Sequence, residues 1–153
     1  MSGGKDELNR ALQQLLNNEN YIILSCTKLI SLSTISSKIA FDEIVRKKGD
    51  LLTVSNNGIK IGDGVTRVKI NATVSLSPTT TASSTERIAI NKNGNDISQM
   101  YQPNISGATA TLTYSDYEID VKKGDVIYLH GSTSTAGVGR IHPNTQFKVS
   151  VVR

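Results

Sequence analysis

Apolar and polar side chains alternate without interruption from Arg67 to Leu76. A period of two residues predicts a β-strand with one face buried and the other in water. The predicted buried positions are Val68, Ile70, Ala72, Val74 and Leu76. Half-buried strands of this kind pack as two facing sheets or close into a barrel. The pattern therefore predicts a β-protein.

The same alternation returns at Ala108–Tyr114 and again at Phe147–Val151. Shorter apolar runs predict further strands at 21–26, 39–45, 51–54, 59–61, 87–90 and 126–130. The Asn57-Gly58 step favours a tight hairpin between two of them. Longer loops are expected at 78–85, 98–107 and 131–145. Short strands with frequent turns indicate an all-β fold, an antiparallel two-sheet jelly-roll sandwich.

Residues 5–19 have a different character, because strong helix formers replace the strand pattern. Leu8, Leu12 and Leu15 are spaced by four and then three residues, as along a coiled-coil seam. A helix of about four turns is unstable alone. It must either lie on its own domain or associate with copies of itself. The predicted organisation is a helical segment, 1–20, followed by a head domain, 21–153.

Candidate chemistry is sparse. The chain has a net charge of +4, one cysteine (Cys26) and two histidines, His130 and His142. No nucleophile elbow, zinc-binding helix or dinucleotide loop is found, so we expect no enzyme activity, no cofactor and no metal site. Cys26 is expected to be a buried structural thiol, and both histidines to be satisfied at the surface.

The same properties limit the partners. The basic runs 46–48 and 122–123 are typical of solvated turns rather than of a nucleic-acid stripe. No stretch reaches the ~20 apolar residues of a membrane helix, and no signal peptide is evident. We therefore expect no nucleic-acid binding and no membrane insertion.

The order of short motifs resembles the complement-head/tumour-necrosis-factor type of jelly roll. The first half contains Ile39-Ala40-Phe41-Asp42, then Gly49-Asp50-Leu51-Leu52, then a short hairpin and the long strand from Arg67. The second half contains Ile88-Ala89-Ile90-Asn91-Lys92-Asn93-Gly94, then Lys122-Lys123-Gly124-Asp125 before an apolar strand, and a closing strand from Phe147. More narrowly, the arrangement is similar to small trimeric fibre or head-decoration proteins of phages and prophages of Gram-positive bacteria.

The resemblance implies a homotrimer with a mostly apolar threefold interface and the leading helix near the threefold axis. It implies a virion structural protein, made in the cytoplasm of a bacterial host, whose helix and base contact other virion proteins. The alternative is a secreted or spore-surface ligand or lectin module of the same fold. Capsid and tail genes as neighbours would favour the first.

Any receptor contact, to a host-surface glycan or protein, is expected on loops held by the strands. Successive strands alternate in direction, which predicts that loops 94–107 and 131–145 lie at the apex and the lysine-rich turns near the base. The best contact candidates are Tyr101, Gln102, Asn104, Arg140 and His142.

Overall fold

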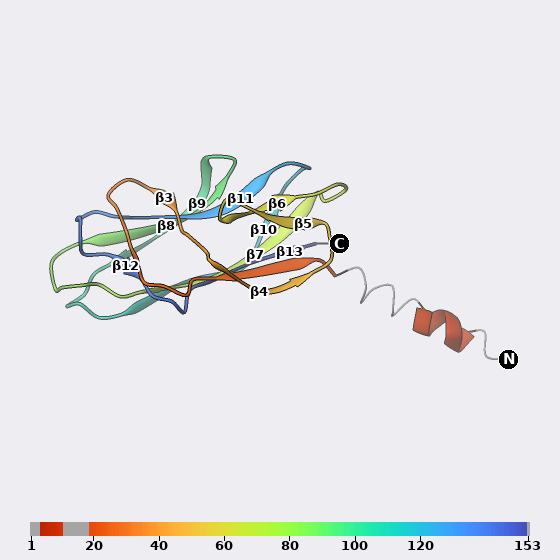
Figure 1. Cartoon of the computed structure of the whole chain (residues 1–153), viewed down its shortest axis with the longest axis horizontal. Helices are drawn as coiled ribbons and strands as arrows, with labels where there is room; N and C mark the ends of the chain where they lie inside the picture. The colour runs from red at the N-terminus through yellow and green to blue at the C-terminus, as the bar shows by residue number, and fades with distance from the viewer. Residues whose placement is uncertain (1–3, 11–18, 153) are drawn as a thin grey trace.

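Two antiparallel β-sheets face each other in the computed structural model, which describes residues 4–10 and 19–152 (Figure 1). The strands of the first sheet are β1 (Tyr21–Ser25), β2 (Ile30–Ser31), β4 (Glu43–Lys48), β7 (Arg67–Leu76), β10 (Ala110–Asp120), β12 (Arg140–Ile141) and β13 (Gln146–Val151). Those of the second are β3 (Ser37–Lys38), β5 (Leu52–Ser55), β6 (Gly58–Ile61), β8 (Thr85–Lys92), β9 (Asn95–Pro103) and β11 (Val126–Thr133).

The first sheet, called sheet A below, has the order β2-β12-β7-β13-β1-β4, with β10 paired to β7. The second, sheet B, has the order β5-β6-β11-β8-β9, with β3 paired to β11. Strands that are distant in the sequence thus lie side by side, as in a jelly roll. The predicted fold class is confirmed in architecture, while the oligomeric state stays a prediction.

The alternation at Arg67–Leu76 is confirmed as strand β7, whose apolar positions are all buried. Several other predicted boundaries are wrong. The predicted loop 131–145 contains the end of β11, which runs to Thr133, and the short strand β12. The stretch 98–107 is strand up to Pro103, as part of β9. The predicted strand 39–45 begins only at Glu43, and β10 continues to Asp120 past a bulge after Tyr114.

The hairpin between β5 and β6 was predicted at the right place but for a different reason. Its two central residues are Asn56 and Asn57, with φ of 49° and 67°. Asparagine tolerates this left-handed backbone, which matches the twist of the flanking strands. Gly58 is the first residue of β6, where a Cβ would lie 2.5 Å from the ring of Tyr128. Gly58 is therefore required by packing rather than by the turn.

The core lies between the sheets and is built mainly from aliphatic side chains, among which Phe41 and Phe147 form an aromatic pair. Phe147 is fully buried, and its ring centroid lies 5.5 Å from that of Phe41. Phe147 belongs to β13, which pairs with β1 on one side and with β7 on the other. The aromatic pair therefore sits beneath the middle of sheet A.

The sandwich has two distinct ends. We call the end where β13 terminates, at Val151 beside Val68, the base. The opposite end, where Leu76 pairs with Ala110 and Ile141, is the apex. The turn 121–125 lies at the base, as predicted. The β8–β9 turn at Asn93 also lies near the base, because the backbone amide of Asn93 donates a hydrogen bond to the carbonyl oxygen of Val126. Only the part of loop 94–107 that follows β9 therefore reaches the apex, which corrects the prediction for the rest of that loop.

Cys26 follows β1 and is buried, as predicted, with 2% of its surface exposed. Its thiol Sγ lies 3.6 Å from the carbonyl oxygen of Ala40. Burial, with the negative charge of Asp42 nearby, raises the pKa of the thiol to about 12. The thiolate is therefore a negligible fraction at neutral pH, which agrees with a packing role.

The N-terminal residues 4–10 form a short helix separate from the sandwich (Figure 1). All seven are exposed, and Leu8 exposes 61% of its surface. Leu8 thus has no packing partner on its own head domain. Leu12 and Leu15, the other two positions of the predicted seam, lie outside the described residues.

Candidate functional site

The five predicted contact residues lie on two different sheets. Tyr101 and Gln102 are within β9 of sheet B rather than on a loop, and Asn104 follows that strand. Arg140 is in β12 of sheet A, and His142 follows it. Tyr101 is the most exposed of them, at 55%, and pairs with Arg87 of β8.

Residues 77–84 connect these two groups at the apex. The side-chain amide of Asn104 donates to the carbonyl oxygens of Thr80 (2.9 Å) and Ala82 (2.8 Å). On the sheet A side, Arg140 Nε donates to the carbonyl oxygen of Ser77 at 2.9 Å. Asn104 and Arg140 therefore brace this loop through the side-chain amide of Asn104 and Nε of Arg140.

His142 occupies a different environment from Tyr101. It lines a shallow hollow with Ser75, Thr109, Thr111 and Asn144 on the solvent face of sheet A. Its Nδ1 accepts a hydrogen bond from the Asn144 amide at 3.3 Å. The candidate residues at the apex therefore fall into two separate groups, one around Tyr101 and one around His142.

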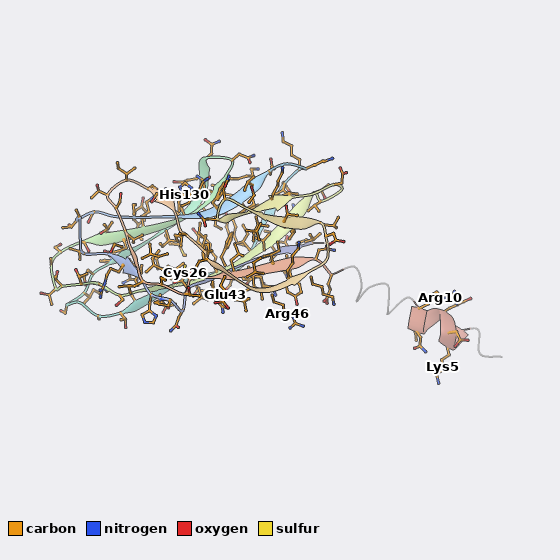
Figure 2. All side chains as sticks on the ribbon, in the orientation of Figure 1. Lys5, Arg10, Cys26, Glu43, Arg46 and His130 are labelled. Carbon is orange, nitrogen blue, oxygen red and sulfur yellow. The ribbon has the colours of Figure 1, made fainter. Side chains whose placement is uncertain are left out.

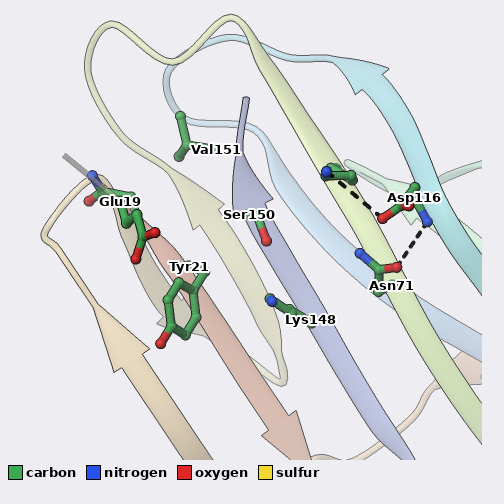
Figure 3. Close-up of a pocket in the computed structure, with 9 residues that line it drawn as sticks. Glu19, Tyr21, Asn71, Asp116, Lys148, Ser150 and Val151 are labelled. Atoms are coloured by element: carbon green, nitrogen blue, oxygen red, sulfur yellow. Dashed lines mark hydrogen bonds and ion pairs between the residues drawn. The ribbon is translucent and has the colours of Figure 1, made fainter. Parts of the chain in front are cut away.

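A larger hollow of about 390 Å³ lies on the solvent face of sheet A towards the base (Figure 3). Its lining is Glu19, Asn20, Tyr21, Lys69, Asn71, Asp116, Lys148, Ser150 and Val151. Most of these side chains are polar or charged. The resemblance implied a mostly apolar threefold interface, and this part of sheet A does not have that character.

The charges in this hollow are only partly paired. Lys69 Nζ lies 3.9 Å from Asp116 Oδ1, and the amide of Asp116 donates to Asn71 Oδ1 at 2.9 Å (Figure 3). Lys148 Nζ lies 5.0 Å from the centroid of the Tyr21 ring, a cation–π arrangement. The hollow can accept polar or ionic groups from a partner surface, but it holds no nucleophile–base pair.

A charged network lies on the solvent face of sheet B. Arg87 of β8 contacts Asp96 of β9 at 2.6 Å and bonds Gln99 with its Nε at 2.9 Å. The other carboxylate oxygen of Asp96 accepts from Asn91 at 2.9 Å. Burial would raise the pKa of Asp96, but these bonds and the charge of Arg87 outweigh it and hold the pKa below 3.8. The network therefore links β8 to β9 through an ion pair between charged side chains.

His130 of β11 lies next to this network, and the prediction of a satisfied surface histidine is wrong for it. Its side chain is half-buried, and Nε2 is sealed from solvent without a hydrogen-bond partner. Burial lowers its pKa below 6.5; Asp96 opposes the shift, while Lys38 and Arg87 add to it. The sequence signal was the position of His130 at the end of the apolar run 126–130.

The base turn after β10 is closed by a buried carboxylate. Asp125 accepts hydrogen bonds from Asn93 Nδ2 at 2.8 Å and from the Lys122 amide at 3.0 Å. Burial alone would raise its pKa, but these bonds and the charges of Lys92 and Lys122 hold the pKa below 3.8. The ionised form is therefore favoured by folding, and its contribution is present at neutral pH and lost as pH falls through the folded-state pKa.

Replacing Asp125 with asparagine should lower the free energy of unfolding at pH 7 by about 1–3 kcal/mol. The difference in free energy of unfolding between the variant and the wild type should shrink in acid. Protonation of the wild-type carboxyl then removes the contribution of its charge. Urea unfolding at pH 7 and pH 3 measures both values. Asp63→Asn is the matched control, since that exposed carboxylate only pairs with Lys123. An unchanged difference at pH 3 would contradict the proposed role of the charge.

The described residues contain no group of three or more His, Cys, Asp or Glu side chains arranged to hold a metal ion. Within the same part of the chain, no helix is long and apolar enough to cross a membrane.

Comparison with known proteins identifies the fold. No protein-family model and no curated protein sequence matches the chain. Among solved structures, murine APRIL at pH 5.0 is 14% identical, with a TM-score of 0.64 over 88% of this chain and 100% of that chain. Eiger TNF from S. frugiperda is 10% identical (TM-score 0.63; 88% and 92% covered), and Pika GITRL is 15% identical (0.52; 88% and 97%). The chain has a TNF-like jelly-roll fold.

Proposed function

We propose that this chain is a non-enzymatic structural protein of a phage virion, in which three copies form a fibre head or decoration module. The observation that carries the proposal is the contrast between its two ends. An exposed leucine, Leu8, precedes the base, whereas the apex presents loops braced by Asn104 and Arg140. One end is suited to assembly and the other to contact.

Assembly is supported by the seam and by the sheet A face. Leu8, Leu12 and Leu15 give three copies an apolar stripe to bury together. The hollow lined by Lys69, Asp116 and Lys148 presents both positive and negative side chains to a neighbouring copy. We propose that the helix and base also attach the trimer to other virion proteins.

The homotrimer is tested by light scattering of the full chain at micromolar concentration, with three chains per particle expected. Leu8→Lys, Leu12→Lys and Leu15→Lys together should weaken the trimer, because charges replace the apolar seam. The head should still unfold cooperatively, since its core is separate. Asn9→Lys with Gln13→Lys is the matched control off the seam. One or two chains per wild-type particle would contradict the proposal.

Contact with a host surface is proposed for the apex. Tyrosine is enriched among interface hot spots, and Tyr101 is the most exposed of the candidates. Tyr101→Ala should reduce binding of the purified protein to host cells or a glycan array without changing the trimer. Lys122→Ala with Lys123→Ala at the base is the control. If only the base variant loses binding, the proposed polarity is wrong.

A further inference from the structure

Residues 33–38 form a strap beside β11 of sheet B, next to the part of β11 that does not pair with β6. All six are exposed, whereas the residues on either side, Leu32 and Ile39, are buried. Ile35, in the middle of the strap, exposes 76% of its surface. The strap is thus anchored in the core at both ends and has little core contact between them.

Few hydrogen bonds hold the strap. Its only strand, β3, pairs His130 with Lys38 and Gly131 with Ser37 on β11. Backbone bonds fix its ends, from the Thr133 amide to the Ser33 oxygen and from the Ile39 amide to the Leu129 oxygen, both 2.9 Å. Segments with few buried contacts are the first to open in a native protein. The strap can therefore open locally while the sheets stay intact.

The side chain directly beside Lys38 on β11 is that of His130. Lys38 Nζ lies 4.2 Å from the centroid of the Tyr128 ring, and that ring is 6.1 Å from the His130 ring in an edge-on arrangement. Figure 2 shows His130 on the sheet that carries β3 and β11. Lys38 at the end of the strap, Tyr128 and His130 thus form one cluster, in which the tyrosine lies against both of the others.

The charges around His130 come from three elements. Lys38 of β3 and Arg87 of β8 are cationic, and Asp96 of β9 is anionic. Arg87 already pairs with Asp96 at 2.6 Å. A proton added to Nε2 would lack an acceptor at that atom and would repel Lys38. The closed conformation of the strap is therefore more stable when the His130 imidazole is neutral than when it is protonated.

We propose that protonation of His130 releases the strap 33–38 from β11. This inference goes beyond the proposed function and does not depend on it. A histidine in an open, hydrated environment titrates near 6.5. Because the closed form binds the proton less well, the open form gains population as pH falls below that value. Release uncovers the edge of β11 at His130 and Gly131 and the ring of Tyr128, a site that acid would expose to a partner.

Hydrogen exchange of the full chain tests the proposal. After correction for intrinsic rates, protection of the amides that pair β3 with β11, and of the Ile39 amide, should fall about tenfold between pH 7.5 and pH 5.5. Amides between β8 and β11 should keep their protection. A pH-independent strap, or an equal loss across sheet B, would overturn the proposal.

Three variants locate the responsible group. His130→Gln should abolish the pH dependence, whereas His142→Gln, at the other histidine, should retain it. Lys38→Gln should reduce it, because the repelling charge is removed. If the dependence persists in His130→Gln or disappears in His142→Gln, the assignment is wrong. A direct NMR titration of His130 in the wild type needs no variant, and a pKa at or above 6.5 would also overturn the proposal.

Discussion

Replacing Phe147 with alanine should lower the free energy of unfolding by about 3–5 kcal/mol. The side chain is fully buried and packs against Phe41 beneath the centre of sheet A. The strands on both sides of β13 hold its backbone in place, so the surrounding core cannot collapse into the space that the ring leaves. Urea unfolding followed by circular dichroism measures the loss.

The control for Phe147→Ala is Gln146→Ala, one residue earlier on the same strand and exposed to solvent. It should change the free energy of unfolding by less than about 0.5 kcal/mol. Small domains have only about 5–15 kcal/mol in total, so the phenylalanine variant should be marginally stable. A loss below about 1 kcal/mol would show that sheet A can repack around the missing ring.

Replacing Gly58 with alanine should cost about 1–3 kcal/mol, although the backbone there has no unusual conformation. The added Cβ would lie 2.5 Å from two ring carbons of Tyr128 and 2.8 Å from the backbone oxygen of Ile127. The Ile127 oxygen belongs to the backbone of β11, and the Tyr128 ring is itself buried, so neither can yield easily. Unfolding in urea gives the magnitude.

A double-mutant cycle separates this clash from a general effect of losing glycine. In a Tyr128→Ala background, Gly58→Ala should cost less, because most of the clashing atoms are gone. Gly64→Ala is the comparison: its φ is +78° and a Cβ there would meet open space, so its cost comes from the backbone alone. That cost should be the same with or without Tyr128. Additive losses at Gly58 and Tyr128 would contradict the packing role.

Strands with one buried face could be predicted from the sequence, whereas strands without a buried face could not. At β7 the alternation specified both boundaries, because neighbouring strands and the core enforce a period of two over its whole length. At β9 the same logic failed. It is an edge strand whose residues are all exposed or half-buried, and Ile97 and Tyr101 point apolar surface into water. Pro103, an apparent loop signal, ends the strand, where proline is tolerated.

The candidate sites were predicted less well than the fold, because they depend on contacts between sheets and loops. The apical position of Arg140 followed from strand direction, but its bond to Ser77 did not. Arg87, Asp96 and His130 come from three strands, and only the strand order and the bulge after Ile90 bring them together. No spacing in the sequence records that arrangement.

The strand order has a consequence for biosynthesis. Of the described strands, β13 leaves the ribosome last, yet it occupies a central position of sheet A between β1 and β7. Until β13 emerges, β1 and β7 each lack the strand that pairs with them in the finished sheet. The core also lacks the side chain of Phe147. Folding of this domain should therefore be completed only once β13 has left the ribosome, and slowly, as in other β-proteins dominated by pairings distant in sequence. A nascent chain stalled before Gln146 should remain sensitive to protease.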